Sequence, residues 1–121
     1  MVIKWNGMNE ELQLFVKWMD FIKWLLNTTE KFPKKARFTF TTRIDNLALD
    51  LLEDIIECRY NKAVRKSGFN GINIKFEKLR ILLRICHEMN YLSTRQFEYA
   101  VTSINEVGKM TGTWLKGSPE A

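Results

Sequence analysis

Residues 93–115 read STRQFEYAVTSINEVGKMTGTWL, and they set our expectation for the fold. Ser93 and Gln96 have the spacing of a capping box, in which each side chain bonds the backbone N–H of the other residue at the start of a helix. Leu92 and Phe97 flank the box as a hydrophobic staple. Apolar side chains then recur at the spacing of one helix face, at Phe97, Val101, Ile104, Val107, Trp114 and Leu115. The stretch therefore predicts an amphipathic α-helix with a defined first residue.

Three earlier segments have the same helical period. Helices are predicted over residues 9–31, 35–60, 72–89 and 93–115. Residues 37–43 alternate polar and apolar side chains, which alone is typical of a strand, but helical spacing follows them without a breaker. The basic segment 61–71 is predicted to be the longest loop, with its turn at Asn70-Gly71. Residues 1–121 therefore read as a single all-α domain, an antiparallel four-helix bundle.

The first and third helices are apolar on two sides. On the first helix, one stripe consists of Leu12, Phe15, Val16, Met19, Ile22 and Leu26, and the other of Leu14, Trp18, Phe21 and Leu25. A helix with two apolar faces is satisfied by a core on one side and a second subunit on the other. We therefore expect a homo-oligomer. Its interface is predicted to contain Trp18, Phe21, Leu25, Ile74, Ile81 and Ile85.

Charge is distributed in blocks along the chain, whose formal net charge is +5. Residues 31–43 contain five bases and no acid, residues 45–57 contain five acids and no base, and residues 59–84 contain eight bases and one acid. A run of like charge is often only a solvated face. Two basic blocks around an acidic one favour a polyanionic partner such as nucleic acid.

The sequence offers little for catalysis. Its only histidine is His87, and it has neither the paired Glu-x-x-His motifs of a di-metal bundle nor a Cys-x-x-Cys pair for zinc. No glycine-rich loop between a strand and a helix is present to hold a nucleotide. The helix neighbours Asp50, Glu53, Asp54 and Glu57 are more typical of an exposed acidic stripe than of an acid/base pair. We therefore expect no catalytic residues, no metal and no cofactor.

Neither a membrane span nor a secretory signal is predicted. No apolar run approaches the length of about 20 residues that a membrane-crossing helix needs. The N-terminal residues have no apolar core and no cleavage site of small residues. Cys58 and Cys86 lie within apolar stretches and are expected to be reduced, packed thiols. These features lead us to expect a cytoplasmic protein.

Three stretches resemble the accessory variability determinant (Avd) family of small four-helix-bundle proteins. They are Phe32-Pro33-Lys34 after the first helix, Leu79-Arg80-Ile-Leu-Leu83-Arg84 in the third helix, and Glu106-Val-Gly108-Lys109-Met-Thr-Gly112-Thr-Trp114-Leu-Lys116 in the fourth. The last stretch is similar to the closing signature of the family, Gly-Lys followed by Gly-x-Trp. The resemblance covers roughly residues 15–116.

The resemblance implies an accessory protein of a diversity-generating retroelement, assembled as a pentameric barrel of bundles. Such a barrel binds the reverse transcriptase and the template RNA or its cDNA, and it has no catalysis of its own. The family presents its basic outer surface on the third helix, where this chain has Arg80 and Arg84, with Lys75 and Lys78 as weaker candidates. Charge alone adds Arg65, Lys66, Lys34 and Lys35 to the expected nucleic-acid-binding residues.

Two alternatives remain open. A sister family of bundles, encoded by intervening sequences of ribosomal RNA genes, tends to carry a stretch like Asn-Ile-Ala-Glu-Gly on its second helix. The corresponding stretch here is Asp54-Ile-Ile-Glu-Cys58, which departs from that pattern and favours the Avd resemblance. The other alternative is a bundle that acts as a protein-only scaffold.

Overall fold

The structure is a computed structural model that describes residues 10–116. It contains four α-helices, α1 (Glu10–Thr29), α2 (Thr42–Tyr60), α3 (Arg65–Glu88) and α4 (Thr94–Lys116). Short 3₁₀-helices at Lys34–Ala36 and Lys62–Val64 and a π-helix at Arg37–Thr41 lie in the connections. The described residues contain no strand, so the all-α prediction is confirmed. The predicted first residue of the first helix, Asn9, lies outside the described residues.

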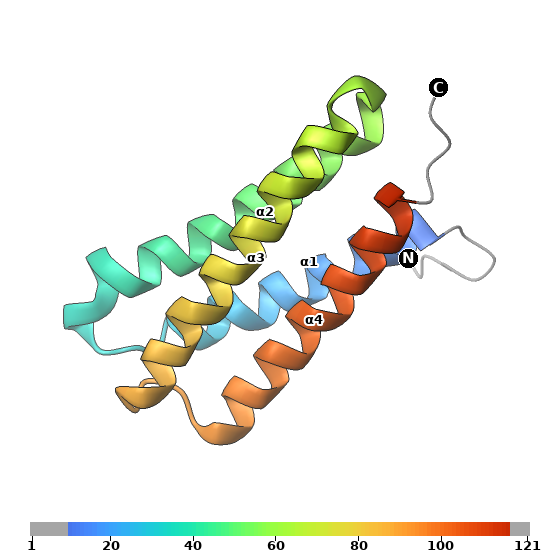
Figure 1. Cartoon of the computed structure of the whole chain (residues 1–121). Helices are drawn as coiled ribbons and strands as arrows, with labels where there is room; N and C mark the ends of the chain where they lie inside the picture. Colours follow the sequence, from blue (N-terminus) through green and yellow to red (C-terminus); the bar gives the residue numbers. More distant parts are fainter. Residues whose placement is uncertain (1–9, 117–121) are drawn as a thin grey trace, which may run out of the picture.

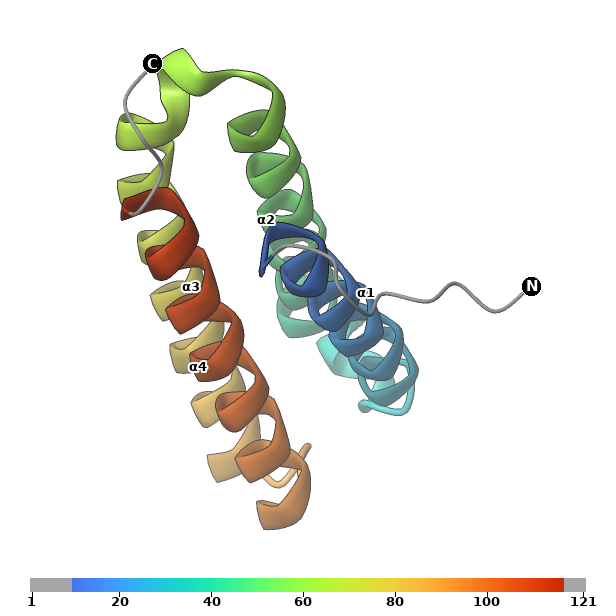
Figure 2. The same ribbon diagram turned by 90° about the vertical axis from the view of Figure 1, so that its right-hand side faces the viewer.

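The four helices form a bundle in which each packs against two others (Figure 1). Figure 2 shows α1 beside α2 and α3 beside α4, and α1 also contacts α4 while α2 contacts α3. The α1–α2 and α3–α4 connections lie at one end of the bundle and the α2–α3 connection at the other (Figure 1). At the first end, the ring of Tyr91 packs against the rings of Phe32 and Phe40, with centroids 5.6 and 6.4 Å away.

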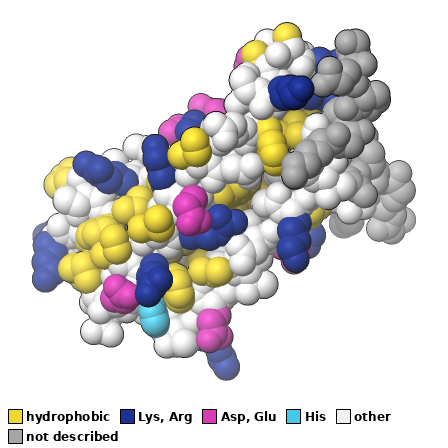
Figure 3. All heavy atoms as spheres, in the orientation of Figure 1, with side chains coloured by type: hydrophobic (Ala, Val, Ile, Leu, Met, Phe, Trp, Pro, Cys, Tyr) yellow, Lys and Arg dark blue, Asp and Glu magenta, His cyan; other side chains and the backbone are white. Residues whose placement is uncertain are grey.

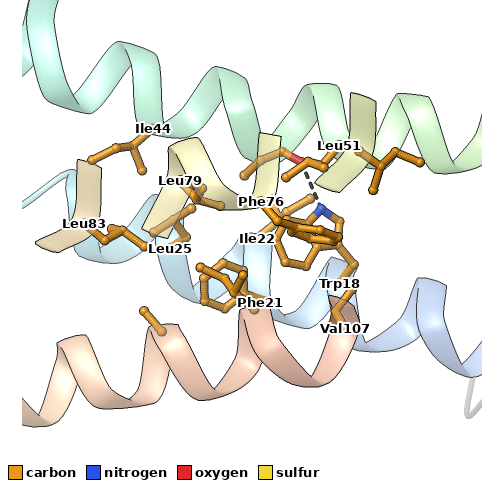
Figure 4. Close-up of a cluster of buried hydrophobic side chains, with 14 of the residues drawn as sticks. Trp18, Phe21, Ile22, Leu25, Ile44, Leu51, Phe76, Leu79, Leu83 and Val107 are labelled. Atoms are coloured by element: carbon orange, nitrogen blue, oxygen red, sulfur yellow. Dashed lines mark hydrogen bonds between the residues drawn. The ribbon is translucent and has the colours of Figure 1, made fainter. Parts of the chain in front are cut away.

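Trp18 lies at the centre of the core (Figure 4). It has no solvent exposure, and its indole N–H donates a hydrogen bond of 2.9 Å to the carbonyl oxygen of Ala48 on α2. Its ring meets Phe76 of α3 edge-on, with centroids 5.5 Å apart, and lies 5.0 Å from Phe21. Aromatic side chains of this size fill the space between four helices and bury much apolar area.

The assignment of Trp18, Phe21 and Leu25 to the subunit interface was wrong. All three are at most 1% exposed within one bundle, so they cannot contact another copy. Of the other stripe, Met19 and Leu26 face outward, each 37% exposed, whereas Ile22 is buried at 7% exposure. The period of the sequence identifies both stripes, but the bulky aromatic stripe is buried because it fills the core better.

The prediction of a loop over residues 61–71 was also wrong for most of this segment. Helix α3 already begins at Arg65, and Asn70-Gly71 lies inside it. The guanidinium of Arg65 donates a hydrogen bond of 2.7 Å to the carbonyl oxygen of Cys58. It also lies over the Trp114 ring, 5.3 Å from the ring centroid. These tertiary contacts extend the helix through residues with a turn preference of their own.

The segment before α2 is helical, as predicted, although its alternation is typical of a strand. A π-helix covers Arg37–Thr41, and the backbone N–H of Thr42 reaches back to the carbonyl oxygen of Arg37. Ala36 and Phe40, which are four residues apart, both turn toward the interior. The capping box of α4 is confirmed by two hydrogen bonds. The backbone N–H of Ser93 donates a hydrogen bond of 2.9 Å to Gln96 Oε1, and the backbone N–H of Gln96 donates one of 3.1 Å to Ser93 Oγ.

Gly68 marks a close approach of α3 to α2 that a substitution can test. A Cβ at this position would lie 2.8 Å from the Sγ atom of Cys58, so Gly68→Ala is expected to lower the free energy of unfolding by about 1–3 kcal/mol. Gly71→Ala in the same helix is the matched control, because a Cβ there meets nothing within 4 Å and alanine favours the helix by up to about 1 kcal/mol. Urea unfolding measures both changes. Equal shifts in the two variants would contradict the close packing at Gly68.

Candidate nucleic-acid interface

The outer face of α3 combines an apolar stripe with basic residues. Ile74 and Ile81 are 49% and 51% exposed, and Ile85 is half-buried. Figure 3 shows hydrophobic side chains gathered on this side of the molecule, with lysine and arginine side chains around them. The five buried residues of α3, Ile72, Phe76, Leu79, Leu83 and Cys86, lie on the other side of the helix and face the core.

The basic residues of α3 lie on both sides of this stripe. Toward α2, the Nζ atom of Lys75 is 2.5 Å from a carboxylate oxygen of Asp54. Toward α4, Arg80 Nε donates a hydrogen bond of 2.8 Å to the side-chain oxygen of Asn105. Arg80 also forms an ion pair with Glu77 at 3.2 Å. The candidate residues on α3 therefore form two edges around an apolar stripe, and Lys75 and Arg80 are held by side chains of the neighbouring helices.

Arg80 occupies a groove between α3 and α4. Only 30% of its side chain is exposed, and a Cβ at Gly108 would lie 3.6 Å from its Nη2 atom. A Cβ at Gly112, one turn further along α4, would lie 3.8 Å from the ring of Phe69. At both glycines of the closing signature, α4 therefore lies beside side chains of α3.

Arg84 and Lys78 are the more accessible bases of α3. The side chain of Arg84 is 72% exposed and pairs with Glu88 at 3.2 Å. A pair of this kind on a helix surface contributes only about 0.3–0.5 kcal/mol, so a phosphate can replace the carboxylate. Lys78 is exposed beside an apolar groove between α2 and α3, whose lining includes Leu47, Ile81 and Leu82.

The other four candidates are divided between the two ends of the bundle. Arg65 and Lys66 begin α3, and the contacts of Arg65 with Cys58 and Trp114 give it a structural role. Lys34 and Lys35 lie in the α1–α2 connection at the opposite end. Helix α2 has 19 residues, so about 28 Å separates the two pairs. The structure does not bring the eight candidates together into one site.

One surface residue was missed from the sequence. Phe38 lies in the α1–α2 connection, and its side chain is 86% exposed, more than any other large hydrophobic residue in the described part of the chain. The aromatic and basic residues of 37–43 were a signal for it, but their alternation directed attention to secondary structure.

Groups with potential reactivity are protected in this fold. Cys58 and Cys86 are free and buried, and burial raises the pKa of the Cys86 thiol to about 11. Burial also raises the pKa of Cys58, so both thiols are protonated at neutral pH. The ring of His87 stacks on Phe97 with centroids 4.8 Å apart. Across residues 10–116, no cluster of three or more His, Cys, Asp or Glu side chains is suited to hold a metal ion.

Comparisons with known proteins give one match. A family model described as bAvd-like matches residues 13–118, which is most of the chain, and it confirms the resemblance seen in the sequence. No curated protein and no solved structure matches. Among the helices of the described residues, none has the length and apolar character required to cross a bilayer.

Proposed function

The chain belongs to the bAvd-like family, and from this membership we propose that it is a non-catalytic accessory protein of a diversity-generating retroelement. In this proposal it binds the reverse transcriptase and the template RNA or its cDNA, in the cytoplasm, and supports mutagenic reverse transcription. The observation that carries the proposal is the family match over residues 13–118. The distribution of bases over the outside of the bundle supports it.

Nucleic-acid binding would depend on phosphate contacts of the exposed bases. Lys78 and Arg84 lie on the outer face of α3, and Arg80 lies at its edge toward α4. Contacts of this kind position a nucleic acid without reading its sequence. Each neutralised phosphate releases counterions, so binding of this type weakens steeply as salt is added.

We further propose that the antiparallel bundles assemble into a ring, as a pentamer. A closed ring joins two different surfaces of each subunit. The stripe of Ile74, Ile81 and Ile85 on α3 supplies one apolar surface, and Met19 and Leu26 on the outside of α1 supply another. Apolar patches exposed on a monomer commonly mark interaction sites. Assembly would place the basic edges of α3 beside the subunit contacts.

Replacing both arginines tests the nucleic-acid site. Arg80→Gln/Arg84→Gln is expected to weaken binding of a structured RNA and to reduce the slope of log K against log salt by about 1.4–1.8, because two phosphate contacts are lost. Fluorescence anisotropy of a labelled RNA over a KCl series measures both quantities. Circular dichroism of the variant checks that the bundle is still folded.

Lys17→Gln/Lys23→Gln is the matched control, because it removes the same charge from exposed positions on α1. This control is expected to keep the wild-type slope. If the arginine variant and the control bind with equal affinity and equal slope, α3 is not the nucleic-acid site. Gel filtration of the chain with the reverse transcriptase of its retroelement tests the protein partner, and co-elution is expected.

A further inference from the structure

The α1–α2 connection carries bases that the fold does not use. The exposed bases of this connection are Lys31, Lys34, Lys35 and Arg37, and Arg43 follows in the first turn of α2. None of them forms an ion pair with another residue of the described chain, whereas Lys75, Arg80 and Arg84 on α3 all do. The strongest concentration of available positive charge is therefore at this end of the bundle, outside α3.

Phe38 projects from the middle of this basic segment. Its neighbours Phe32, Ala36 and Phe40 face the interior, and the rings of Phe32 and Phe40 pack on Tyr91. These contacts fix the backbone on both sides of Phe38, while its own side chain is 86% exposed. A single exposed apolar residue is ordinary on a protein surface. An anchored, exposed aromatic ring surrounded by unpaired bases has the composition of a platform for stacking nucleobases.

We propose that Phe38, with Lys34, Lys35 and Arg37, forms a binding site for single-stranded nucleic acid. One unpaired base stacks on the ring of Phe38, and the three cations contact the adjoining phosphates. A duplex hides the faces of its bases, so the site prefers single strands. This inference rests on the proposed function and assigns its single-stranded substrate to the α1–α2 connection.

Substitutions at Phe38 distinguish stacking from a general apolar contact. Phe38→Ala and Phe38→Leu are both expected to weaken binding of a single-stranded oligonucleotide by about 5- to 150-fold, the range that loss of one stacked base produces. Phe38→Trp is expected to bind as tightly as the wild type or more tightly. Binding of a duplex of the same length is expected to change little in all three variants. Anisotropy of labelled RNA and DNA strands gives these affinities.

Tyr60→Ala is the matched control at the other end of the bundle. Tyr60 is 76% exposed and, like Phe38, lies close to arginine, with the Arg59 guanidinium 5.4 Å from its ring centroid. The control is expected to keep wild-type affinity for single strands. Light scattering on each Phe38 variant is expected to give the wild-type mass.

Five results would overturn the inference. If Phe38→Ala binds single strands with wild-type affinity, Phe38 is not part of the site. If Phe38→Leu binds them with wild-type affinity, the contact is not base stacking. Equal losses on single strands and duplexes would exclude the single-strand preference. A lower mass of the Phe38 variants would assign the residue to contact between copies. If the wild-type chain binds no nucleic acid of any kind, the proposed function fails together with this inference.

Discussion

Trp18→Ala is expected to lower the free energy of unfolding by about 3–5 kcal/mol, the usual range for loss of a fully buried tryptophan. The indole is unexposed and bonds the carbonyl oxygen of Ala48 at 2.9 Å. It also contacts Phe21 and Phe76, so one side chain links three of the four helices. Alanine would leave a cavity at the point where these helices meet.

Trp24→Ala is the matched control for this substitution. Trp24 lies on the same helix but is half-buried, and its ring stacks on Phe21 and meets the ring of Tyr99 at a tilt. Trp24→Ala is expected to lower the free energy of unfolding by distinctly less than Trp18→Ala does. Urea unfolding followed by circular dichroism, at one fixed subunit concentration, compares the two variants. If Trp18→Ala lowers the free energy of unfolding by less than about 1 kcal/mol, the central position of this residue is contradicted.

Ile81→Asp is expected to convert the proposed assembly into single chains of 14.3 kDa. Ile81 is 51% exposed in the isolated bundle, so the monomer tolerates aspartate there. In an assembly that covers the stripe, the same carboxylate would be buried without a partner, which costs several kcal/mol. Light scattering at micromolar concentration measures the mass.

Tyr60→Asp serves as the control for this experiment, since it introduces the same charge at an exposed position away from the stripe. It is expected to keep the mass of the wild type. A wild-type mass of 14.3 kDa would contradict the proposed assembly. An assembly that survives Ile81→Asp would show that the contact lies elsewhere.

The helices could be predicted from the sequence because local chemistry determines where they begin and which residues they contain. The Ser93–Gln96 box and the core stripe of α3 depend only on residues close together in the chain. The inward side of α1 could not be predicted, because both of its faces are apolar and the choice depends on how Trp18 fits among the other helices. The prediction of a turn at Asn70-Gly71 was wrong for a similar reason, since contacts with distant residues stabilise the helix that contains these two residues.

The candidate interface was harder to predict than the fold. Charge blocks identify where bases occur, but not which of them are already paired. Lys75 finds its partner Asp54 21 residues away, and Arg80 finds Asn105 25 residues away. Only the folded chain shows that the bases around Phe38 have no such partner among residues 10–116, and that the ring itself faces solvent.

The salt dependence of RNA binding by the unmodified chain tests the central claim, that the outside of this bundle holds nucleic acid through its bases. Four phosphate contacts predict a loss of affinity of roughly 100-fold between about 50 and 200 mM KCl. Binding that is tight at low salt and falls along a straight line of log K against log salt would agree with the claim. No binding at low salt, or an affinity that does not change with salt, would contradict it.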